Sequence, residues 1–152
     1  MARDAAAALG TLRDAAAVEP LIDVLNDANG YFHSVVRAAA ALSLAQLGDA
    51  RAIDALVNAI NDPIAEASAE AIRALGALAN ARAISPLINV TRNQNGYFAP
   101  IARRAAVLAL AQLGGDDAVL ELRAVAANTW EDSVVREEAE KAIQRHGATK
   151  SK

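Results

Sequence analysis

The sequence contains no cysteine, few aromatic residues and no long uninterrupted apolar run. The absence of cysteine excludes disulfides, thiolate metal sites and thiol nucleophiles. The two histidines, His33 and His146, lie far apart without the spacing typical of metal ligands. No segment approaches the roughly 18 consecutive apolar residues of a membrane-spanning helix, and the first residues do not resemble a secretory signal. We therefore expect a cytoplasmic protein with no metal, no cofactor and no membrane association.

Charge of neither sign dominates, because 15 Lys and Arg face 18 Asp and Glu, which gives a net charge of −3. Nucleic-acid-binding domains usually carry a basic excess. The acidic pairs Asp116-Asp117 and Glu137-Glu138 are adjacent in sequence, whereas neighbours on one helix face are three or four residues apart, so neither pair forms a catalytic dyad. Gly114-Gly115 lacks the lysine of a phosphate-binding loop. We expect a non-catalytic protein.

Alanine is abundant, and it lies within an internal repeat. The sequence is 54% hydrophobic but only 3% aromatic, and alanine favours helices and close helix packing. The segment Leu47-Gly-Asp-Ala-Arg-Ala-Ile aligns with Leu78-Ala-Asn-Ala-Arg-Ala-Ile, 31 residues later. Equivalent positions at 12, 47, 78, 113 and 146 are separated by 35, 31, 35 and 33 residues. Self-similarity of this length indicates a helical repeat array.

Each period contains two amphipathic helical patterns joined by a polar turn, and no strand is required. The expected helices cover residues 3–13, 16–27, 34–47, 51–60, 63–79, 82–92, 100–113, 117–127 and 132–146. They form one domain over residues 1–147, in units of about 1–14, 15–48, 49–79, 80–114 and 115–147, followed by a disordered tail over 148–152. The first unit holds only the second helix of a pair. The sequence predicts an all-α solenoid of about nine helices.

The unit from Val36-Arg37 through an alanine run and Leu-Ala-Gln-Leu-Gly-Asp-Ala-Arg-Ala-Ile to Leu56 resembles the short HEAT-like repeats of phycobilisome lyases. Weaker copies begin at Ala67-Ser68, Ala102-Arg103 and Val135-Arg136. The resemblance implies a right-handed superhelix with the second helix of each pair on its concave side. A HEAT-like iron hydroxylase family uses repeated His-Glu pairs, and these are absent from this sequence.

Three functions compete on these grounds. The architecture favours a scaffold or adaptor that binds a partner protein. The resemblance alone implies the alternative, a subunit or fragment of a bilin lyase-like, chromophore-handling protein. A nucleic-acid binder would use arginines such as Arg73 and Arg104, but Glu66 and Glu70 share the same predicted face and would repel phosphates. We therefore expect a protein partner and no nucleic acid.

The outward face of the second helices is predicted to be apolar in the first and third full repeats and charged in the others. Helical periodicity points Val35 and Leu42 outward in the first of these, and Ile101 and Leu108 in the third. Exposed apolar residues in register are typical of a recognition surface. The same groove offers a route to self-association. The alternative is that these four residues belong to the core.

Most aromatic residues fall at one inter-helix turn. The element Asn-Gly-Tyr-Phe occurs at residues 29–32 and 95–98, and Trp130 aligns with the two tyrosines. Amphipathic rings on neighbouring loops are good interface anchors, whereas Phe32 and Phe98 have the alternative of covering the ends of their helices. The predicted partner-binding residues are Tyr31, Val35, Leu42, Tyr97, Ile101, Leu108 and Trp130.

One arginine recurs in each of three units, and an acid or amide precedes it. Such a regular series is typical of a structural ladder, in which each guanidinium bonds across the helix turn or to the neighbouring repeat. We therefore exclude these arginines from the partner-binding surface. The arginines are Arg37, Arg103 and Arg136, preceded by Asp27, Asn93 and Asp132.

Overall fold

The computed structural model describes residues 1–27 and 30–149, with side chains described up to residue 146. This part of the chain forms nine α-helices and three short 3-10 turns, and it contains no strand. The helices are α1 (Ala2–Leu12), α2 (Val18–Asn26), α3 (Ser34–Leu47), α4 (Ile53–Ala59), α5 (Ala65–Leu78), α6 (Ile84–Arg92), α7 (Pro100–Leu113), α8 (Asp116–Ala127) and α9 (Ser133–Thr149). The turns η1 (Ala15–Ala17), η2 (Ala50–Ala52) and η3 (Ala81–Ala83) precede α2, α4 and α6.

The predicted number and order of helices are therefore confirmed, and the largest difference lies at the end of α9. This helix continues to Thr149, so residues 148 and 149 are helical and not part of a disordered tail. Residues 150–152 of the expected tail lie outside the described residues, as does Asn29 of the first Asn-Gly-Tyr-Phe element.

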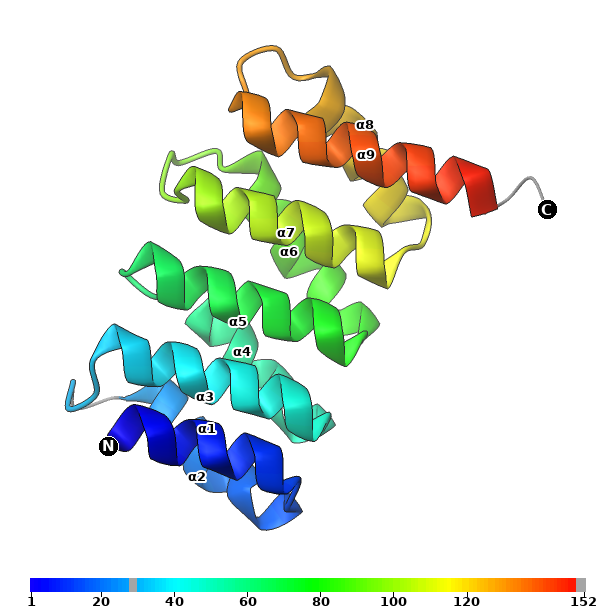
Figure 1. The fold of residues 1–152 in the computed structure, drawn as a ribbon. Helices are drawn as coiled ribbons and strands as arrows, with labels where there is room; N and C mark the ends of the chain where they lie inside the picture. Colours follow the sequence, from blue (N-terminus) through cyan, green and yellow to red (C-terminus); the bar gives the residue numbers. More distant parts are fainter. Residues whose placement is uncertain (28–29, 150–152) are drawn as a thin grey trace.

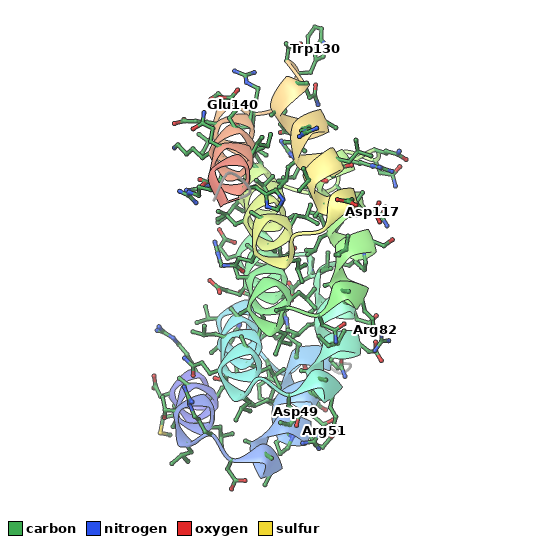
Figure 2. All side chains as sticks on the ribbon, turned by 90° about the vertical axis from the view of Figure 1, so that its right-hand side faces the viewer. Asp49, Arg51, Arg82, Asp117, Trp130 and Glu140 are labelled. Atoms are coloured by element: carbon green, nitrogen blue, oxygen red, sulfur yellow. The ribbon has the colours of Figure 1, made fainter. Side chains whose placement is uncertain are left out.

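The helices stack in two layers (Figure 1). The odd-numbered helices lie side by side in chain order, each packed on the next, and the even-numbered helices form the layer behind them. In the side view the odd-numbered layer lies on the inner side of a shallow bend (Figure 2). The two ends of the chain lie at opposite ends of the stack (Figure 1). The molecule is thus an all-α solenoid, and α1 is the unpaired second helix expected for the first unit.

The core between the layers repeats in register. Each even-numbered helix contributes a buried leucine at an equivalent position, and α3, α5 and α7 contribute another from the opposite layer. These leucines are Leu21, Leu56, Leu87 and Leu122 on the even layer, and Leu44, Leu75 and Leu110 on the odd layer. Buried alanines fill the space between neighbouring odd helices, which lets their backbones approach closely. Burial of this repeated apolar set is the main force that stabilises the stack.

On the outer, even-numbered layer, exposed ion pairs connect neighbouring repeats. Arg51 bonds both Asp49, at 2.8 Å, and Glu19 of the preceding unit, at 3.1 Å. Arg82 bonds Asp54 in the same way at 2.6 Å. The hydrogen bond from Arg51 lowers the pKa of Asp49 below its ordinary value. Asp117 takes the place of the arginine in the next unit, so this series ends there (Figure 2).

Among the described residues, no helix combines the length and the apolar character needed to span a lipid bilayer.

Candidate partner-binding surface

The loops that carry the tyrosines are held by a side chain at the end of the preceding helix. In the α2–α3 loop, the Asp27 carboxylate accepts hydrogen bonds from the backbone N–H groups of Tyr31, at 2.8 Å, and Phe32, at 3.0 Å. In the α6–α7 loop, Asn93 accepts a hydrogen bond from the Phe98 N–H at 2.8 Å and donates one to its carbonyl at 3.2 Å. These bonds fix the backbone from which the aromatic side chains project.

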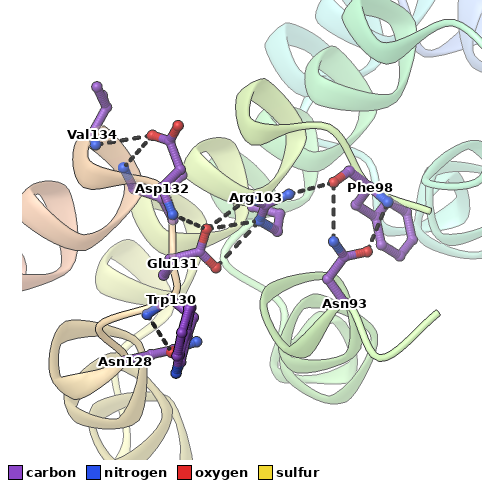
Figure 3. A network of polar contacts seen from close by, with 9 residues as sticks. Asn93, Phe98, Arg103, Asn128, Trp130, Glu131, Asp132 and Val134 are labelled. Carbon is purple, nitrogen blue, oxygen red and sulfur yellow. Dashed lines mark hydrogen bonds and ion pairs between the residues drawn. The ribbon is translucent and has the colours of Figure 1, made fainter. Parts of the chain in front are cut away.

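One arginine connects each of these loops to the next repeat. Arg103 donates to the carbonyl of Phe98 at 2.6 Å and to the Glu131 carboxylate, with Nη2 2.6 Å from Oε1 (Figure 3). Glu131 lies in the α8–α9 loop, and its side chain is only 6% exposed. The loops of the third and fourth helix pairs are therefore connected by a nearly buried ion pair.

Arg37 makes the same arrangement two helix pairs earlier, on α3. It donates to the carbonyl of Phe32 and to both carboxylate oxygens of Asp62, with Nε 2.6 Å and Nη2 3.0 Å from them. The hydrogen bond with Asp62 raises the pKa of Arg37 above its ordinary value, so the guanidinium stays charged. The expected pairing between repeats is thus present at two positions. In both, the arginine forms its shortest ion pair with an acid of the following loop and not with the residue that precedes it in sequence. Arg136 has no ion pair within the described part of the chain.

The predicted rim aromatics are exposed. Tyr31 is 80% exposed and Trp130 96%, and Trp130 projects from the end of the stack (Figure 2). Tyr97 is 54% exposed, and its hydroxyl donates to the carbonyl of Asn61 in the preceding repeat at 2.8 Å. Phe98 instead packs against the core, with its ring edge-on to that of Tyr97. Phe98 is therefore partly buried, whereas Tyr97 is exposed.

The predicted apolar residues Val35 and Ile101 are exposed at the N-terminal ends of α3 and α7. Two further apolar residues occupy the same edge: Val134, the second residue of α9, and Ile64, which directly precedes α5. Sequence reasoning missed Ile64 because the short 31-residue repeat lacks the aromatic element, and the only signal was its position after Asp62-Pro63. We name this edge the rim surface, formed by Tyr31, Val35, Ile64, Tyr97, Ile101, Trp130 and Val134.

The other two predicted apolar residues line the same hollow. Leu42 and Leu108 line opposite sides of a hollow of about 300 Å³ that crosses α3, α5 and α7, which we name the inner hollow. Alanines form much of its wall. Arg73 and Glu70, both on α5, also line it and form an ion pair at 2.6 Å. Leu42 is exposed as predicted, but Leu108 is half-buried, so the expectation of free exposure is wrong for Leu108. Leu108 also lines a second hollow together with Ala142 of α9, so its side chain lies between α5 and α9.

Comparisons with known proteins agree with this architecture. A family model for HEAT repeats matches residues 1–67, 32–98 and 58–144. No curated protein sequence matches the chain. Among solved structures, the complex of CpcE and CpcF of phycocyanin lyase from Nostoc sp. PCC7120 is similar, with a TM-score of 0.74 and 25% identity over 93% of this chain. This chain covers 57% of the length of that lyase chain.

A looser similarity exists to human deoxyhypusine hydroxylase in complex with glycerol. Its TM-score is 0.45 and its identity 18%, over 97% of this chain and 79% of the hydroxylase chain. The expected resemblance to lyase-type HEAT-like repeats is confirmed by the family model and by the phycocyanin lyase structure. Because the matches to HEAT repeats extend from residue 1 to residue 144, the chain belongs to the HEAT repeat family.

Proposed function

We propose that this protein is a non-catalytic scaffold or adaptor that binds a partner protein through the rim surface and the inner hollow. The observation that carries this proposal is the exposure of apolar and amphipathic side chains at equivalent positions of the first, third and fourth helix pairs. Such residues contribute little to folding where they are exposed, whereas aromatic and aliphatic anchors dominate protein interfaces.

The hydrogen-bonded loops support the same proposal. The backbone around Tyr31 and Tyr97 is held by Asp27 and Asn93. Arg37 and Arg103 connect these loops to the next repeat. A surface that is ordered before binding loses less conformational entropy when the partner arrives. The similar phycocyanin lyase structure is itself a complex of CpcE with CpcF, so a solenoid of this type takes part in a protein assembly there.

Site-specific photo-crosslinking tests the proposal. A benzoylphenylalanine residue at position 35 or 101 should crosslink the same partner protein from cells that produce this chain. The matched control positions are Ser85 and Arg123, which are exposed on the even-numbered layer. Equal crosslinking at the control positions, or none at any position, would contradict the proposal. Once the partner is identified, Val35→Ser combined with Ile101→Ser should lower the affinity for it by about tenfold or more.

A specific observation also favours a second candidate, a bilin lyase-like, chromophore-handling subunit. The similarity to phycocyanin lyase covers 93% of this chain. In that case the purified protein, mixed with a linear tetrapyrrole bilin, should shift the visible absorption spectrum of the bilin. An unchanged spectrum at micromolar protein would remove this candidate and leave the scaffold.

A further inference from the structure

A second surface, distinct in chemistry from the rim surface, follows the edge where the even-numbered helices end. One open hollow, of about 330 Å³, lies between the α2–α3 and α4–α5 loops. A second, of about 510 Å³, lies between the α4–α5 and α6–α7 loops. Asn61 lines both hollows, so they meet at this residue and together follow one edge across three helix pairs.

Side-chain amides line this edge. Asn26, Asn58 and Asn61 line the first hollow, and Asn89, Gln94 and Asn95 join Asn61 in the second. We name these six residues the amide track. Asn58 and Asn89 occupy equivalent positions of their repeats, as do Asn26 and Asn61. None of the six amides has a hydrogen-bond partner among the described residues, because the loops are held by Asp27 and Asn93 instead.

The charged groups along the amide track are already neutralised. Arg37 in the first hollow is paired with Asp62 and lies 3.5 Å from Asp27, which also lines this hollow, and Arg92 in the second is 3.1 Å from the Glu121 carboxylate. The residues that line the two hollows carry two positive and two negative charges, so the track offers hydrogen-bond donors and acceptors without a net charge. This excludes a strongly anionic or cationic ligand as its best fit, since neither sign of charge would find an unpaired counterion.

The chemistry fits the main chain of a polypeptide. A side-chain amide both donates and accepts hydrogen bonds, and so does each peptide group. Neighbouring packed helices lie roughly 8–10 Å apart, and an extended chain rises about 3.3 Å per residue, so each repeat would span about three residues. The Tyr97 ring, which also lines the second hollow, provides an apolar contact for one side chain.

We propose that the amide track binds an extended, uncharged segment of another polypeptide through its main-chain N–H and C=O groups. This goes beyond the proposed function. The rim surface and the inner hollow would contact side chains of the partner, whereas the amide track would hydrogen-bond to the main chain of the bound segment. The two sites share only Tyr97, so each can be tested without the other.

A phage-displayed library of linear 12-residue peptides without charged residues provides the probe. The intact protein should enrich peptides from it, and a synthetic copy of an enriched peptide is then titrated by fluorescence anisotropy. Asn61→Ala should weaken binding about fivefold or more, because this residue serves both hollows and each lost hydrogen bond costs about 1 kcal/mol. Methylation of alternate main-chain nitrogens of the peptide should weaken binding further, with little dependence on salt.

Gln144→Ala is the matched control, since Gln144 is an exposed amide on α9, outside the track. It should leave affinity unchanged, and thermal melts should show both variants folded. A Val35→Ser, Ile101→Ser variant should also keep peptide binding, which separates this proposal from the scaffold proposal. Absence of enrichment, equal affinity of Asn61→Ala, or full binding of the methylated peptide would overturn the proposal. Asn61-dependent binding of chitotetraose with no peptide binding would overturn it in favour of a sugar.

Discussion

Arg37 joins three groups of its surroundings. It bonds the carbonyl of Phe32 and the carboxylate of Asp62, and it lies 3.5 Å from Asp27. The two carboxylate side chains are only 7% and 3% exposed. An acid in such a place is tolerated because a guanidinium compensates its charge, and removal of the cation leaves the charge uncompensated.

Arg37→Ala should therefore lower the free energy of unfolding by about 2–4 kcal/mol. Arg82→Ala provides the comparison at an exposed pair, where its side chain is 65% exposed and that of its partner Asp54 74%. Loss of an exposed ion pair costs at most about 1 kcal/mol. Urea unfolding of the two variants beside the parent measures both values. Equal, small losses would mean that water replaces the guanidinium in the Arg37 cluster.

At the scale of the elements, the odd-numbered helices are held together by their small residues. A Cβ atom added at Gly76 of α5 would lie 2.9 Å from both the Cα and the Cβ atom of Ala109 on α7. It would also lie 2.6 Å from Oε1 of Gln112. The side-chain amide can move aside, but the α7 backbone cannot do so without a shift of the whole helix.

Gly76→Ala tests this contact through the sign of its effect. Helix propensity alone predicts a gain of about 1 kcal/mol for alanine in a helix interior. The contact with α7 predicts a net loss of about 1–3 kcal/mol, because overpacking forces the helices apart. Ala77→Gly, at an exposed position of the same helix, isolates the propensity effect and should destabilise by about 1 kcal/mol. A Gly76→Ala variant that melts at a higher temperature than the parent would disprove the close approach.

For the whole molecule, stability depends on contacts between neighbouring units. A cut after Asn80 separates α1–α5 from α6–α9 and removes the α5–α7 contact. The fragments have 80 and 72 residues, and each buries a smaller fraction of its surface than the intact stack.

The fragments 1–80 and 81–152 should each be clearly less stable than the parent, because the apolar face that they shared becomes exposed to water. Thermal melts followed by circular dichroism compare the two fragments with the intact chain. Two fragments that each unfold cooperatively with the full stability of the parent would instead indicate two independent domains.

Several features of this protein followed from its sequence alone. The repeat period, the helix order and the outward direction of Val35, Leu42 and Ile101 depend on short-range helical periodicity, and the repetition of each pattern makes it readable. The exposed positions of Tyr31 and Tyr97 followed from the same register. Local patterns specify these features because a helix buries the same face in every unit of a stack.

Only the tertiary structure decided which groups of different units meet. Arg103 bonds Glu131, 28 residues further along the chain, although Asn93 was the nearer candidate. The half-burial of Leu108, the place of Ile64 on the rim surface and the meeting of the two hollows at Asn61 likewise depend on how neighbouring repeats are spaced and rotated. That geometry results from the packing of many side chains at once, and no single segment of sequence contains it.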